Sequence, residues 1–153
     1  MNNPVTWFVV ADGHRARVFR RIGSGTVEPA LDHDFAAPNP RDHEVGADRP
    51  GRTQASAGTA RSALEETDHH RRRKREHLEA LAAELDDGAL RDKYAQLYVI
   101  APPQALGDLR SCLGRHARER LVGESPHDVT QEPLQSLVRR FDELVVESAN
   151  RRA

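Results

Sequence analysis

Two short apolar runs constrain the fold of this 153-residue chain more than any other feature. Residues 5–10 read VTWFVV and residues 96–101 read QLYVIA. Short continuous runs rich in β-branched and aromatic residues are typical of strands buried on both faces of a sheet. The sequence therefore predicts a sheet with residues 5–10 at its centre and residues 96–101 parallel to them.

The first 35 residues predict an antiparallel meander. Asp12-Gly13 is a turn signal, and so is the Gly-Ser-Gly stretch at residues 23–25. These turns separate the first apolar run from a second strand at residues 16–19 and a weaker third strand at residues 26–31. Strands joined by such short connections pair as antiparallel neighbours.

Residues 62–153 predict the alternating order αβαβα. The first helix of this half is expected from a capping box at Ser62–Glu65 to residue 85, where Asp86-Asp87-Gly88 ends it. The later elements are a strand at 96–101, a helix at 103–113, a strand at 120–124 and a helix capped by Thr130. Alternation implies parallel strands, so we expect one α/β domain with a mixed five-stranded sheet of ribonuclease-H-like topology.

Residues 36–61 lack periodicity and are punctuated by proline and glycine. Long stretches without secondary structure inside small domains are usually functional or disordered. We therefore expect an exposed loop here, poorly packed over residues 38–58. Farther along the chain, the thirteen consecutive positions Glu65–His77 contain no apolar residue. That half of the helix is expected to be solvated, bound to a partner or projecting over roughly 20 Å.

Charge is distributed unevenly along a chain whose formal net charge is −1. Residues 41–75 hold nine bases and six acids, and residues 69–75 hold five bases and no acid. Only two of the 23 bases are lysines. A preference for arginine suits phosphate recognition, although a GC-rich genome explains it equally well. Binding of phosphate here would be salt-sensitive, and the scarcity of aromatic residues argues against sequence-specific reading of RNA.

Four segments resemble the bacterial host-attachment protein family over nearly the whole chain. They are WFVVADGHRARVF at 7–19, DRPGR at 48–52, YVIAP at 98–102 and GESPHDVT at 123–130. The chain also resembles the middle domain of archaeal and eukaryotic peptide-release factors. That resemblance implies a glycine-rich tip loop at residues 51–56 and a long basic helix after it.

The tip loop departs from the release-factor pattern. Arg52 and Thr53 stand where two glycines would be, and only Gln54 matches the tip. Arginine and threonine resist the backbone conformations that glycine adopts, so peptidyl-tRNA hydrolysis is not expected. Gln54 is accordingly a weak catalytic candidate, and no other catalytic residue is proposed. The expected RNA- or partner-binding residues are Arg49, Arg52, Gln54, Arg61, Arg71, Arg72, Arg73, Lys74 and Arg75.

Other chemistry has little support in the sequence. No HExxH, CxxC, P-loop, GxGxxG or GxSxG motif occurs, so no metal or cofactor is expected. His70 and His77 share a helix face but are read as surface histidines. Asp12 is read as a turn residue, and the alternative is a metal-dependent nuclease in which Asp108 or Asp128 approaches it.

The resemblance implies a cytoplasmic, non-catalytic factor of translation or its quality control that binds the ribosome or structured RNA. The alternative is an interaction or scaffold protein linked to host attachment. No membrane association is expected, because no apolar run approaches the roughly 20 residues of a span. The protein partners are left open. The single cysteine, Cys112, is expected to be a half-buried, unreactive thiol.

Overall fold

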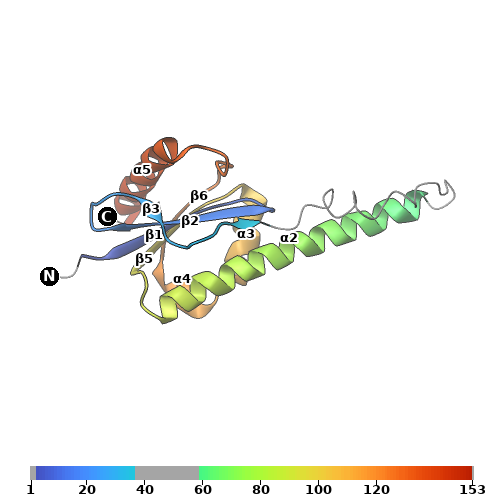
Figure 1. Ribbon diagram of the computed structural model, residues 1–153, viewed down its shortest axis with the longest axis horizontal. Coiled ribbons are helices and arrows are strands. Elements are labelled where there is room, and N and C mark those ends of the chain that lie inside the picture. The colour runs from blue at the N-terminus through green and yellow to red at the C-terminus, as the bar shows by residue number, and fades with distance from the viewer. Residues whose placement is uncertain (1–2, 37–58, 153) are drawn as a thin grey trace.

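The N-terminal apolar run forms strand β1 (Val5–Ala11) at the centre of a mixed sheet. The computed structural model describes residues 3–36 and 59–152, with the side chains of residues 59–62 left out. Within these ranges the chain is one α/β domain with a sheet and four helices (Figure 1). Strand β1 pairs antiparallel with β2 (Arg15–Ile22) and parallel with β5 (Gln96–Ile100), as predicted. Strand β6 (Leu121–Ser125) continues the parallel side.

The sheet differs from the predicted five strands at its antiparallel edge. The third strand shrinks to β3 (Glu28–Pro29), and an unpredicted strand β4 (Phe35–Ala36) also pairs with β2. Pro29 pairs with Phe19 but has no N–H to donate, and β3 ends at this residue. The chain returns to β2 at Phe35, whose ring packs against the core. The described strand order is β3-β2-β1-β5-β6, with β4 also against β2.

Helices cover both faces of the sheet. Helices α2 (Thr59–Leu90), α3 (Pro103–Cys112) and α4 (Arg115–Arg120) lie on one face, and α5 (Leu134–Arg152) lies on the other (Figure 1). Trp7 and Val9 of β1 point into the first core, whereas Phe8 and Val10 point into the second. This two-sided burial explains why the run at 5–10 is continuously apolar rather than alternating.

Helix α2 is longer than predicted at both ends. It begins at Thr59, so the proposed N-cap Ser62 lies inside it, and it continues through Gly88 to Leu90. Gly88 is a packing residue here and not a terminator. A Cβ atom at this position would lie 2.9 Å from the Trp7 ring and 3.2 Å from the Tyr94 ring. The missing side chain therefore lets the end of α2 approach the sheet closely.

The second half differs from the prediction at two further places. Helix α4 was not predicted, because its six residues bury only Ala117 and give no apolar stripe. Its Ala117 N–H is held by Asp86 of α2 at 3.0 Å. Thr130 is not the N-cap of α5, which begins at Leu134. The Thr130 hydroxyl is instead engaged with Asp12. None of the described helices combines the length and the hydropathy that a membrane span requires.

Candidate functional site

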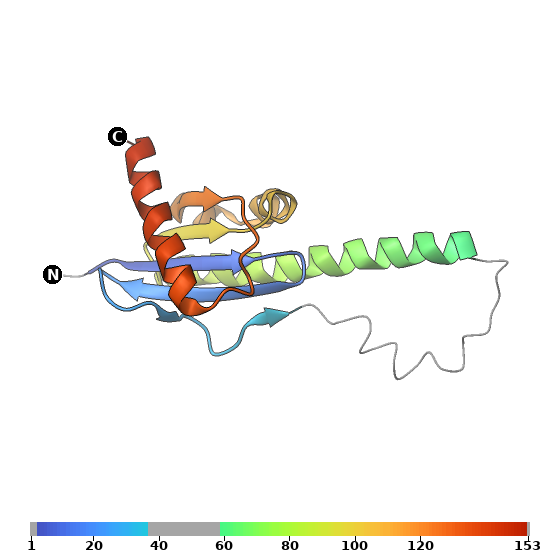
Figure 2. The same cartoon turned by 90° about the horizontal axis from the view of Figure 1, so that it is seen from above.

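The polar half of α2 (residues 63–77) extends past the sheet (Figure 2). The whole helix has 32 residues, a length of about 48 Å at 1.5 Å per residue. Side chains 63–69 are all exposed, and the continuous burial of apolar side chains begins only at Leu78. The polar half therefore offers most of its surface to solvent, as its composition predicted.

The basic residues of the polar half differ in exposure. Arg71, Arg72 and Arg75 are exposed, whereas Arg73 and Lys74 are half-buried, with the Lys74 stem against Gly13 of the β1–β2 turn. Among the described residues no acid forms an ion pair with any of these five. Elsewhere arginines are commonly paired, as at Arg20, Arg21, Arg91, Arg110, Arg115, Arg120, Arg140 and Arg151. The basic run of α2 is thus the part of the described surface where positive charge gathers without acidic partners.

The turn between β1 and β2 is organised by the Asp12 carboxylate. One oxygen accepts hydrogen bonds from the backbone N–H groups of His14 and Arg15, both at 2.7 Å. The other accepts the Thr130 hydroxyl at 3.0 Å. Partial burial by itself raises the pKa of Asp12, but these hydrogen bonds outweigh it and hold the pKa below its usual value. Asp12 is therefore an ionised structural group, in agreement with its reading as a turn residue.

The base of the polar half rests on this turn (Figure 2). The Lys74 stem covers Gly13, where an added Cβ would lie 3.2 Å from Lys74 Cδ. The rings of His14 and His70 have centroids 5.1 Å apart. His77 is 6% exposed, and its buried Nε2 has no hydrogen-bond partner among the described residues. The expectation that this half of the helix is solvated is therefore wrong at His70, Arg73, Lys74 and His77.

His14 and His77 at this junction favour the neutral form. Burial lowers the pKa of His14, and the nearby His70 and Lys74 lower it further, while Asp12 acts in the opposite direction. Burial also lowers the pKa of His77, and the nearby backbone carbonyls of Arg15 and Asp12 offset this only in part.

The sequence contains a pattern that could have predicted this junction. Positions 70, 74, 77, 78 and 81 share one helix face. The apolar stripe of the C-terminal half is therefore extended toward the N-terminus by polar residues whose side-chain carbons can pack on the domain.

The two acids suggested as partners of Asp12 have different positions. Asp128 does approach it, because the Thr130 hydroxyl lies 3.0 Å from Asp12 and 3.2 Å from Asp128. Asp108 lies on α3 near Cys112, where it helps burial to raise the pKa of that half-buried thiol. Within residues 3–36 and 59–152, no three His, Cys, Asp or Glu side chains are placed to hold one metal ion. The Asp12 oxygens are already occupied by protein donors.

The loop candidates cannot be placed in this site. Arg49, Arg52 and Gln54 lie outside the described residues, as does the expected loop at 38–58. Arg61 belongs to the first turns of α2, but its side chain is not described. These residues remain predictions, and the described part of the site consists of the polar half of α2 and the β1–β2 turn.

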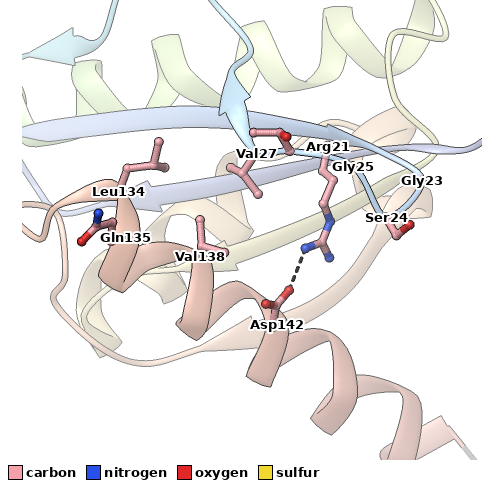
Figure 3. A pocket seen from close by; sticks show the side chains of 10 residues that line it. Arg21, Gly23, Ser24, Gly25, Val27, Leu134, Gln135, Val138 and Asp142 are labelled. Carbon is pink, nitrogen blue, oxygen red and sulfur yellow. Dashed lines mark hydrogen bonds and ion pairs between the residues drawn. The ribbon is translucent and has the colours of Figure 1, made fainter.

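A hollow of about 650 Å³ lies between the β2–β3 connection and α5 (Figure 3). Its apolar lining includes Val27, Leu134 and Val138. Arg21 extends across one end to Asp142, with 2.7 Å between Nη1 and Oδ1. This ion pair neutralises the charge of the hollow, so the hollow differs chemically from the basic surface of α2, which has no ion pair among the described residues. Sequence reasoning missed it, because the lining comes from segments about 110 residues apart.

Together these features define a small α/β domain with one long helix, whose basic side chains form no ion pairs within the described residues. The family model described as "protein required for attachment to host cells" matches residues 7–141. The chain belongs to this host-attachment family, as the four sequence segments indicated. Comparison with curated proteins gave no significant match.

Proposed function

We propose that this host-attachment family protein binds the phosphate backbone of structured RNA, free or within the ribosome, through the polar half of α2. Its role would be that of a non-catalytic factor in translation or its quality control, working in the cytoplasm. The observation that carries the proposal is the lack of acidic partners for Arg71, Arg72 and Arg75 among the described residues. The resemblance to release-factor middle domains supports the choice of RNA as the partner.

The chemistry of the arginines fits this proposal. Guanidinium groups bind phosphate oxygens in a bidentate manner and do not lose their charge near neutral pH. Arg71 and Arg75 are four residues apart, so they lie on one face of the helix, with Arg72 beside them. Such contacts position a protein on a nucleic-acid backbone without reading base sequence. Arg49, Arg52 and Arg61 are proposed to extend this surface, with Gln54 as a non-hydrolytic contact.

A salt titration of RNA binding tests the proposal. We compare the R71Q/R72Q/R75Q variant with the matched control R91Q/R115Q/R151Q, which removes the same charge from helical ion pairs elsewhere. Each lost phosphate contact lowers the slope of log K against log salt by about 0.7 for single strands. The test variant should lose a slope of up to about 2, whereas the control should keep the wild-type slope. Equal slopes for both variants would contradict the proposal.

Affinity purification from cells tests the physiological partner. Wild-type protein should recover RNA and ribosomal proteins, and R71Q/R72Q/R75Q should recover less of both.

The hollow in Figure 3 supports a second candidate, an interaction or scaffold protein. Its apolar lining includes Leu134, which is 37% exposed, and a neutral, partly apolar surface suits a protein partner better than a polyanion. Recovery of a protein without RNA, lost in V138E and retained in R71Q/R72Q/R75Q, would favour this candidate.

A further inference from the structure

The junction of the β1–β2 turn with α2 concentrates cationic and titratable side chains. His14 comes from the turn, and His70 and Lys74 come from the facing side of α2. The two imidazole centroids are 5.1 Å apart, and the Lys74 stem lies over Gly13, the residue before His14. Arg73 adds a guanidinium whose Nη2 lies 3.5 Å from His70 Nδ1. Four groups that carry or can take up a proton therefore share one small surface.

The nearest acids do not neutralise this surface through direct pairing. Asp12 receives two backbone N–H groups and the Thr130 hydroxyl, so its oxygens face the protein's own donors. Asp128 lies on the far side of Thr130. Within the described part of the chain, His14, His70 and Lys74 form no ion pair with any acid. An anion from solution would meet donors that no carboxylate of this region already binds.

We propose that His14, His70 and Lys74 form a binding site for a single tetrahedral oxyanion of the phosphate or phosphomonoester class, and that binding strengthens as the pH falls. The site lies on the side of α2 that meets the β1–β2 turn, whereas the proposed RNA contacts are the exposed Arg71, Arg72 and Arg75. It requires no nucleic acid, so it goes beyond the proposed function and is tested separately.

The pH dependence follows from the neighbours of the two imidazoles. In the free protein His14 faces His70, Lys74 and His77 of α2, all of which oppose its protonation, and Asp12 of the turn, which favours it. A bound dianion would cancel this repulsion and favour the protonated imidazoles as donors. Proton uptake on binding means that affinity rises as pH falls, by up to tenfold per pH unit for each proton taken up.

His77 gives an independent reason to place the ligand on the outer side of the junction. It is 6% exposed and sits beneath the turn, with its Nε2 lacking a hydrogen-bond partner in the described residues. Burial lowers the pKa of His77, so this ring beneath the turn takes up a proton less readily than an exposed histidine. His14, by contrast, is exposed and accessible to an anion.

NMR of the histidine rings in the full-length protein tests the site. Sulfate, whose charge is constant in this range, and inorganic phosphate are titrated at about pH 6 and about pH 7.5, on either side of the ordinary histidine pKa. We expect saturable shifts of the His14 and His70 rings, tighter binding at the lower pH, and a higher pKa for His14 when sulfate is bound. The exposed His33 ring should show no saturable shift.

Variants separate the site from general charge effects. H14Q and H70Q should each weaken sulfate binding at least tenfold, whereas H33Q and R71Q/R72Q/R75Q should bind as the wild type does. Thermal melting of each variant checks that it is folded. Linear shifts shared by His14 and His33, or sulfate binding that is unchanged in both H14Q and H70Q, would overturn the proposal. Loss of RNA binding alone in R71Q/R72Q/R75Q leaves this site intact, so the two proposals can fail separately.

Discussion

Replacing Asp12 tests whether the β1–β2 turn is the structural base of the functional surface. In Asp12→Ala the backbone N–H groups of His14 and Arg15 and the Thr130 hydroxyl lose their acceptor. Each such hydrogen bond has a net value of about 0.5–1.5 kcal/mol, and the site is partly hydrated, so we expect a loss of about 2–3 kcal/mol. For a domain of this size the Tm should fall by about 4–12 °C.

Asp12→Asn provides the matched comparison. Its side-chain oxygen can still accept both backbone N–H groups, and its amide can donate to the Thr130 hydroxyl, which then donates to Asp128. The loss should therefore be only about 1 kcal/mol. Urea unfolding of the two variants and the wild type gives these values directly. The reasoning is refuted if Asp12→Ala is as stable as the wild type, or if Asp12→Asn is as unstable as Asp12→Ala.

Three further outcomes are expected. Gly88→Ala should destabilise the protein by about 1–3 kcal/mol in urea unfolding, since its Cβ would lie 2.9 Å from the Trp7 ring; a stabilised variant would mean that helix propensity outweighs packing. His77 has a folded-state pKa below the ordinary 6.5, so the unfolded state binds more protons and stability should fall as pH drops below about 6.5. Stability measured against pH should show a smaller fall in H77Q. Arg49→Ala should weaken RNA binding with unchanged melting, whereas Gln54→Ala should not abolish binding; hydrolysis of peptidyl-tRNA that vanishes in Gln54→Ala would contradict this.

The central strands could be predicted because their signal is local and their environment is uniform. Every residue of the run at 5–10 except Val5 is buried, so composition alone identified the strand, and the same holds for β5. The chain connections then fixed their parallel pairing. Strand β4 has only two residues, and its pairing with β2 depends on where Phe35 finds space against the core. No local pattern encodes that contact.

The errors in α2 have a common physical cause. Gly88 has a low helix propensity, but the absence of a Cβ atom lets the helix pack against Trp7 and Tyr94. Trp7 is far from Gly88 in the sequence, and Tyr94 lies beyond the end of the helix. His77 is polar by composition, yet it is buried beneath a turn that ends more than 60 residues earlier. In both cases tertiary packing overrides a correct local preference. The exposure of the basic side chains could be predicted because it depends on no contact with a distant segment of the chain.

Helix α2 is supported unevenly along its length. Residues 77–90 pack on the sheet, whereas residues 59–76, about 27 Å of helix, extend beyond it. Of the described side chains at 63–76, those at 70, 73 and 74 are half-buried and the others are exposed. The helix is therefore anchored on the sheet at its C-terminal end, and the Asp12–His14 turn supports the point where it leaves the sheet. A helix of about 10–12 Å diameter can enter a recess that would exclude the rest of the domain. The width of the partner's opening, and not only its charge, would then decide what this protein can touch.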